Sequence, residues 1–140
     1  MIRSRPLTVA LAWLPVVSYT LLIWWLSSQV FQFELMDELP WRDKGVHFVE
    51  YGAMGFFIAH AIATTWPGRG IAGIVVSVLM TVMLGLLDEL HQAFVPGRSS
   101  DVLDLVADGA GALVAVLFYA ALARLVRGAQ SERTDLIAPQ

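Results

Sequence analysis

The sequence predicts an all-α integral membrane protein, a four-transmembrane-helix bundle with both termini inside. Of its 140 residues, 57% are hydrophobic and only 15% are charged, and the mean hydropathy is +0.66. This apolar share exceeds what a soluble domain of that length can bury. Four long apolar runs separated by short polar segments indicate the spans.

The first run, residues 7–26, contains no charged residue. At about 1.5 Å per residue it crosses roughly 30 Å, the thickness of the hydrocarbon core. Arg3 and Arg5 precede it, as in a signal peptide, but the run is too long and no small-residue cleavage motif follows. We therefore expect an uncleaved helix that Pro15 can kink.

The second and third runs, residues 46–66 and 71–95, flank a turn containing Pro67 and two glycines. The second begins with polar side chains, the third ends with them, and the fourth, residues 102–126, again begins with them. Residues 1–127 thus form one membrane domain, and the polar residues 128–140 are expected to be a mobile cytoplasmic tail.

The distribution of Lys and Arg sets the orientation, because cytoplasmic loops carry the excess of these residues. With the N-terminus inside, six of them lie on the inner side and three on the outer side, which favours N-in and C-in. The inner set is Arg3, Arg5, Arg69, Arg124, Arg127 and Arg133, and the outer set is Arg42, Lys44 and Arg98.

Composition also excludes several classes of function. The net charge is −3 and no basic stripe is present, so nucleic acid is not an expected partner. The chain has no Cys, which excludes a disulfide scaffold, a Cys-ligated zinc site and a thiol nucleophile.

In this topology the polar residues of the spans gather toward the outer side. Helical spacing places them in three stripes that can face one another, each made of residues three, four or seven positions apart. Asp88 lies nine residues before Gly97, about 13 Å along a helix, which is too deep for a short carboxylate to reach water. The stripes are Lys44, His47 and Tyr51, then Asp88 and Gln92, then Asp104 and Asp108.

Acids outnumber bases in this region by seven to two, with two histidines undecided. Such an excess does not stay ionised and unpaired at low dielectric, so some carboxyls are protonated, or water fills a cavity, or a cation binds. The acids are Asp43, Glu50, Asp88, Glu89, Asp101, Asp104 and Asp108, the bases are Lys44 and Arg98, and the histidines are His47 and His91.

Specific chemistries remain open at this stage. His47 with four carboxylates can supply nitrogen and oxygen ligands for a divalent cation, although no H-E-x-x-H motif occurs. Ser99 and Ser100 lack the spacing of a nucleophile elbow and are expected to cap the fourth helix. Arg98 can hold a phosphate or carboxylate, or simply pair with Asp88, Asp101 or Asp104.

The glycines of the second and fourth runs favour close helix packing. They come at short spacings, Gly52 and Gly55 in the second run and Gly109 and Gly111 in the fourth.

Three motifs, taken together and in order, resemble the VanZ-like membrane protein family over roughly Ser27 to Ala120. Asp108 departs from the family pattern, in which Asn is more usual, and adds an acid. The resemblance implies a small multi-pass protein of the bacterial cytoplasmic (inner) membrane, in a family whose founding member is associated with low-level teicoplanin resistance. The motifs are Asp43-Lys44-x-x-His47-Phe48-x-x-Tyr51, Asp88-Glu89-x-x-Gln92-x-Phe94-x-Pro96-Gly97-Arg98 and Asp104-x-x-x-Asp108-x-x-Gly111.

Three functional hypotheses follow. In the first, the protein binds or handles an anionic lipid or lipid-linked cell-wall precursor and so modulates glycopeptide susceptibility. In the second, it is a membrane-embedded hydrolase or transferase acting on a lipid phosphate, and in the third it is a scaffold without catalysis. The candidate catalytic residues are His47, Asp88 and Glu89, and the candidate ligand-binding residues are Lys44, Tyr51, Gln92, Arg98, Asp104 and Asp108.

Overall fold

The computed structural model describes residues 5–29 and 41–137, and within these ranges the chain is helical with no strand. Each helix contains a segment long and apolar enough to cross a membrane, which confirms the predicted all-α membrane fold. The helices are α1 (Arg5–Ser27), α2 (Arg42–Thr65), α3 (Gly70–Gln92) and α4 (Val102–Ile137).

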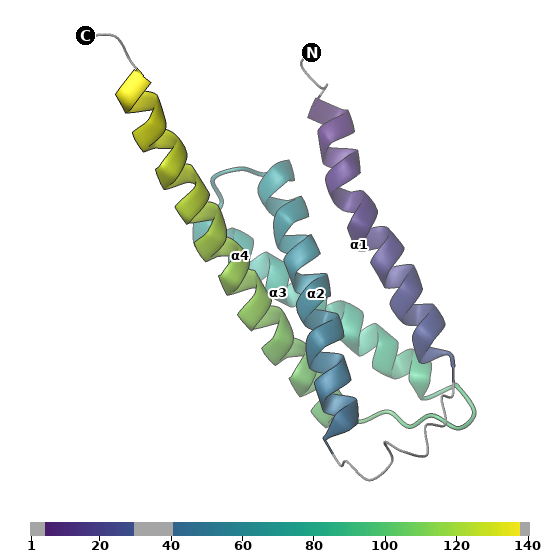
Figure 1. Cartoon of the computed structure of the whole chain (residues 1–140). Coiled ribbons are helices and arrows are strands. Elements are labelled where there is room, and N and C mark those ends of the chain that lie inside the picture. The colour runs from purple at the N-terminus through teal and green to yellow at the C-terminus, as the bar shows by residue number, and fades with distance from the viewer. Residues whose placement is uncertain (1–4, 30–40, 138–140) are drawn as a thin grey trace.

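The described ends of the chain lie at the same end of the bundle, as an even number of crossings requires (Figure 1). The short turn between α2 and α3 also lies toward that end. The connection from α3 to α4 lies at the opposite end, where α1 also finishes and α2 begins (Figure 1). The polar segments that open α2 and α4 and close α3 therefore meet at one end of the molecule.

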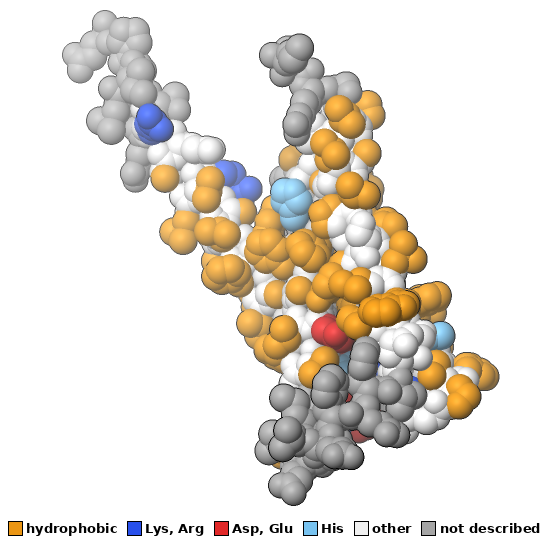
Figure 2. Space-filling model, turned by 45° about the vertical axis from the view of Figure 1, so that its right-hand side comes forward, with side chains coloured by type: hydrophobic (Ala, Val, Ile, Leu, Met, Phe, Trp, Pro, Cys, Tyr) orange, Lys and Arg blue, Asp and Glu red, His pale blue; other side chains and the backbone are white. Residues whose placement is uncertain are grey.

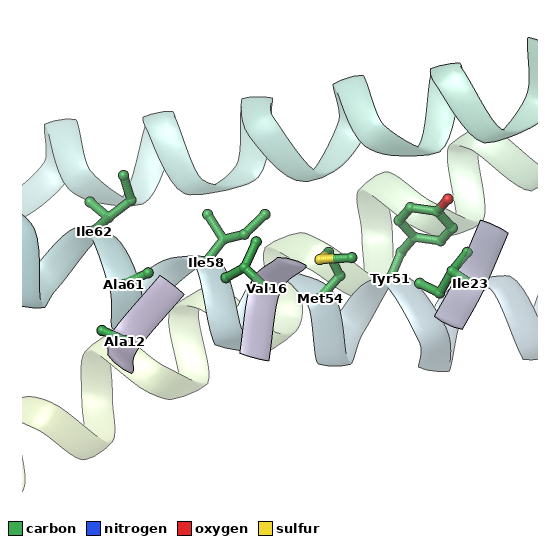
Figure 3. Packing of buried hydrophobic residues seen from close by; sticks show 8 residues of the cluster. All are labelled: Ala12, Val16, Ile23, Tyr51, Met54, Ile58, Ala61 and Ile62. Carbon is green, nitrogen blue, oxygen red and sulfur yellow. The ribbon is translucent and has the colours of Figure 1, made fainter. Parts of the chain in front are cut away.

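Helix α2 is the central element of the bundle. Half of its membrane segment is buried, against about a fifth for each of the other three helices. An apolar cluster from α1 and α2 runs along it (Figure 3). The outward faces of the helices are covered with large apolar side chains (Figure 2), which is the surface that lipid tails solvate. The cluster contains Ala12, Val16, Ile23, Tyr51, Met54, Ile58, Ala61 and Ile62.

Glycines allow α2 and α4 to approach closely, as their spacing predicted. A side chain at Gly111 would overlap the backbone carbonyl of Phe48, and a methyl group at Gly55 would lie 3.1 Å from the Ala112 Cα. Gly109 is less constrained, because its nearest neighbour is a Val82 methyl group at 3.5 Å. The tight crossing point is therefore at Gly111, near the polar end of α4.

Two helix ends differ from the sequence prediction. Helix α4 continues past residue 126 to Ile137, so the described part of the predicted tail is helical; residues 138–140 lie outside the described residues. Helix α3 ends at Gln92 rather than residue 95. Asp88 consequently lies only about one turn, roughly 6 Å, from the end of its helix. Its burial comes from neighbouring helices rather than from depth.

Candidate functional site

A group of buried polar side chains fills the end of the bundle at which α1 and α3 finish and α2 and α4 begin. We call this group, together with Lys44, Arg98 and Asp101 at its edge, the polar site. Burial here is nearly complete, since Asp88 and Asp104 are 1% exposed and Asp108 is fully buried. The buried members are Ser27, His47, Asp88, Glu89, Gln92, Asp104 and Asp108.

Asp88 accepts hydrogen bonds on both carboxylate oxygens. The Ser27 hydroxyl donates to Oδ1 at 2.6 Å, and Gln92 Nε2 donates to Oδ2 at 2.9 Å. The other end of the same Gln92 amide accepts a bond from Arg98 Nη2 at 3.1 Å. A continuous relay therefore runs from the end of α1 through α3 to the loop that precedes α4, and it orients the Arg98 guanidinium.

His47 faces two carboxylates. Its Nδ1 lies 3.0 Å from Asp108 Oδ1, and its Nε2 lies 4.0 Å from Glu89 Oε1. The ring stacks on Tyr51 with centroids 6.1 Å apart and an interplanar angle of 11°, and the Tyr51 hydroxyl points toward α3 (Figure 3). The carboxylate at Nδ1 fixes the orientation of the imidazole, and Nε2 is left facing Glu89.

Lys44 is an ion-paired residue at the edge of the site. Its Nζ lies 2.7 Å from Asp101 Oδ2 and 3.0 Å from Asp104 Oδ1. The hydrogen bond from Lys44, followed by one from the Leu103 amide, lowers the pKa of the Asp101 carboxyl. The Leu103 N–H donates to Asp101 Oδ1 at 2.9 Å, so Asp101 caps α4. The prediction that Ser99 or Ser100 caps this helix was wrong, because the helix begins directly after Asp101.

Three buried polar atoms of the site have no hydrogen-bond partner among the described residues: Glu89 Oε1, Asp108 Oδ2 and Arg98 Nε. Glu89 holds the loop with its other oxygen, which accepts a bond from the Asp101 amide at 2.8 Å. Asp108 Oδ2 occupies the space that a side chain at Gly85 would need, because a methyl group there would lie 2.5 Å from it. The two carboxylate oxygens can each accept a proton, a water molecule or a cation.

A family model described as VanZ/LLP1 matches residues 5–124. The chain belongs to the VanZ/LLP1 family. No curated protein and no solved structure matches the chain. The match covers the three motifs quoted above, so every residue of the polar site falls inside the family region.

In this VanZ/LLP1 protein the structure brings all nine sequence-predicted site residues to one end of the bundle. It joins Asp88 to Gln92, Lys44 to Asp104, and His47 to Asp108. Arg98 bonds to the neutral Gln92 amide. The ion pair with Asp88, Asp101 or Asp104, one of the two alternatives left open by the sequence, is not formed among the described residues.

Two residues that contribute to the site were absent from the predicted set. Ser27 ends α1 and donates to Asp88, and its only signal in the sequence was a polar residue directly after an apolar span. Asp43 groups with His47 and Asp104, and the ligand atoms of these three all lie within 4.8 Å of one another. Of the predicted metal-binding set this group retains only His47 and Asp104, and it adds the exposed Asp43.

This trio has the nitrogen and oxygen donors that zinc or manganese accepts. Lys44 competes with any metal there, because its Nζ already occupies Asp104 Oδ1. The residues therefore fit a weakly held cation better than a permanent metal centre.

Proposed function

We propose that this VanZ/LLP1 protein binds the anionic headgroup of an envelope lipid or lipid-linked cell-wall precursor at the polar site. The chain is N-in and C-in in this proposal, so the polar site opens on the outer face of the cytoplasmic (inner) membrane. The Lys and Arg distribution and the position of both termini opposite the site support this orientation (Figure 1). Binding there modulates susceptibility to teicoplanin-type glycopeptides, the part of the proposal that rests on the family resemblance.

The observation that carries the proposal is the state of Arg98. Its guanidinium bonds to a neutral amide, and its Nε is buried without an acceptor among the described residues. A buried donor with no acceptor is costly, and an incoming phosphate or carboxylate oxygen removes that cost. The planar guanidinium also matches the geometry of both anions.

Lys44 has a different role in the proposal. Two carboxylates already neutralise it, one of them almost completely buried. An anion would have to displace Asp101 and Asp104 to reach the ammonium group. We therefore assign the direct contact to Arg98, while Lys44 fixes the beginning of α4 against α2.

Ser27, Asp88 and Gln92 are positioning residues for Arg98. The Asp88 carboxylate accepts from both neighbours, so it sets which end of the Gln92 amide faces the guanidinium. Removing the charge of Asp88 lets the amide turn over. Arg98 then meets an NH₂ group, which repels it.

The remaining buried groups offset charge. His47 lies 4.0 Å from Glu89 and 3.0 Å from Asp108. One oxygen of each carboxylate has no hydrogen-bond partner among the described residues. In the proposal these oxygens take up a proton or a divalent cation when the anion binds. This uptake compensates both the acid excess of the site and the charge of the ligand.

Binding of a polyprenyl phosphate to the purified full-length protein tests the proposal. Arg98→Ala is expected to weaken binding by roughly tenfold or more, because a charge-assisted hydrogen bond contributes about 1.5–3 kcal/mol. Arg98→Lys keeps the charge but loses the fork, and is expected to bind with intermediate affinity. Arg133→Ala, an exposed cation far along α4, is the control. Equal binding by all four proteins would overturn the role of Arg98.

A lipid-phosphate hydrolase or transferase is the second candidate, and the pairing of His47 with Asp108 favours it. A carboxylate on Nδ1 orients the imidazole so that Nε2 can act as a base, with Glu89 across from it. Phosphate release from a polyprenyl pyrophosphate, lost in His47→Gln and Asp88→Asn proteins that still fold, would establish it. Variants that lose only thermal stability, with wild-type binding and antibiotic phenotype, would instead support a scaffold.

A further inference from the structure

A cavity of about 440 Å³ lies at the opposite end of the bundle, between the α2–α3 turn and α4. This volume falls in the range of small-molecule and cofactor sites. Small and apolar side chains from three helices line its walls, leaving a surface with which a hydrocarbon chain can make contact. The walls include Ile62, Ala63, Ile74, Val116, Ala120 and Ala123.

Three arginines line the same cavity. Arg69 comes from the turn before α3, and Arg124 and Arg127 are three residues apart on one face of α4. All three are exposed, and no acidic residue lines the cavity among the described residues. Their charges are not neutralised by an ion pair with a described carboxylate. Basic side chains are visible toward this end of α4, and acidic ones toward the other end of the molecule (Figure 2).

Amphipathic aromatic side chains mark the level of the cavity. Trp66 directly follows α2 and is 48% exposed. Tyr119 lines the α4 wall with its hydroxyl 3.4 Å from His60 Nδ1. Trp and Tyr concentrate at the depth of the lipid headgroups. Arg69 lies directly before α3, and Arg124 and Arg127 lie in the last two turns of the fourth membrane segment, Val102–Gln130. We therefore expect their charges at phosphate level and the apolar walls in the hydrocarbon.

We infer that this arginine groove, defined by Arg69, Arg124, Arg127 and the apolar walls between them, binds an anionic phospholipid of the leaflet on the side of the termini. The phosphate meets the guanidinium groups, and one acyl chain lies along the walls. Basic pockets between transmembrane helices are suited to anionic headgroups. The inference uses no residue of the polar site, so it stands or falls separately from the proposed function.

The test is lipid retention by the detergent-purified full-length protein, measured by native mass spectrometry with phosphatidylglycerol and phosphatidylcholine of identical acyl chains. Wild type is expected to retain phosphatidylglycerol preferentially. A variant with Arg69→Gln, Arg124→Gln and Arg127→Gln is expected to lose that preference, with binding weakened about fivefold for each arginine removed. Arg133→Gln is the matched control, since it removes an exposed α4 cation outside the cavity.

Two further arms separate the alternatives. Ala120→Phe fills the cavity without changing charge, and is expected to lower retention of phosphatidylglycerol by removing the path of the acyl chain. Arg98→Ala in the same assay distinguishes the two sites: loss of phosphatidylglycerol in Arg98→Ala with retention by the triple variant would place the lipid at the polar site and overturn the inference here. Equal retention of the two lipids by wild type, or unchanged retention by the triple variant, would overturn the inference. Displacement of the lipid by millimolar inorganic phosphate would also overturn it, in favour of a soluble-anion site.

Discussion

At the polar site Lys44 lies 2.7 Å from Asp101 and 3.0 Å from Asp104, whereas Arg69 and Arg124 at the other end line a cavity with no acid beside them among the described residues. At the polar site the charge of Lys44 is neutralised by ion pairs within the protein. At the other end the arginine charges are not neutralised by any described carboxylate. Net charge by itself therefore does not show where an anion binds. Arg98 is informative because, within the acid-rich end, it resembles the arginines of the opposite end in having no ion pair with a described residue.

The comparison assigns the two ends of the bundle to opposite sides of the membrane, and this orientation can be tested directly. Because the Lys and Arg excess lies at the end of the termini, we expect the C-terminus in the cytoplasm. A fluorescent protein fused after Gln140 should therefore be fluorescent, and alkaline phosphatase fused there should be inactive. The effect is all-or-none, and paired alkaline phosphatase and fluorescent protein fusions measure it. Alkaline phosphatase activity in such a fusion would place the polar site in the cytoplasm and the arginine groove outside.

Gly111→Ala is expected to disrupt both ends at once. The added methyl group would overlap the Phe48 backbone carbonyl, which no rotamer change can move, at the point where α2 and α4 cross. We expect a loss of about 3 kcal/mol or more in the free energy of unfolding, the upper range for overpacking. Yield and thermal unfolding in detergent provide the measurement.

Gly128→Ala is the matched control for this change, because it lies on the same helix with nothing within 4 Å of the added methyl group. It should unfold at the wild-type temperature or slightly above. Equal stability of the two variants would show that the crossing of α2 and α4 is looser than the structure indicates.

Asp88→Asn sharpens the comparison by changing only the polar end. The carboxylate accepts from Ser27 and Gln92, and an amide replaces one acceptor oxygen with a second donor. We expect a loss of about 2 kcal/mol in the free energy of unfolding. Denaturant unfolding in detergent micelles measures the loss.

Glu50→Gln serves as the control, since Glu50 is a half-buried acid of α2 with no hydrogen bond to any described side chain. Its cost should be smaller than that of Asp88→Asn, because the change removes no hydrogen bond to a described side chain. If both acid-to-amide changes lower the free energy of unfolding equally, the hydrogen bonds of Asp88 to Ser27 and Gln92 do not stabilise the fold more than an unpaired acid does.

Lys44→Met should give the smallest effect, and one that depends on pH. Lys44 lowers the pKa of the Asp101 carboxyl from its ordinary value of 3.8. A depressed pKa in the folded state stabilises the protein above the unfolded value, and this stabilisation is lost as the pH falls through the folded value. The variant should therefore melt below wild type at pH 7, and the difference should shrink below pH 3.8. A difference that grows on acidification would contradict the ion pair.

The fold and the location of the polar site could be predicted from the sequence, because both follow from short-range patterns. Apolar runs set the spans, and helical spacing placed Asp88 beside Gln92, a contact that the structure shows at 2.9 Å. Partners from different helices could not be predicted. Arg98 bonds to Gln92 rather than to an acid, and Asp88 accepts from Ser27. Both pairings depend on how α1, α3 and the loop before α4 are rotated against one another.

The length of α4 escaped prediction for another reason. Polar residues after 126 indicated the end of a membrane span, but a helix need not stop where the membrane does. The backbone continues in helical form to Ile137 in the described part of the chain. Gly128 after Arg127 is also a common stop signal, yet the helix passes through it, because one Gly only weakens a helix and no Pro follows before Pro139.

The Asp108 carboxylate in the space left open by Gly85 has a consequence for how this protein can evolve. Positions 85 and 108 share one space, so the effect of a substitution at either position depends on the residue at the other. A side chain at position 85 therefore requires the Asp108 side chain to move or to be replaced by a smaller one, and exchange of the acid for the equally large Asn would not free the space. A single substitution at Gly85 is therefore expected to cost more than the same substitution made together with Asp108→Ala, and the difference measures the space that the two residues share.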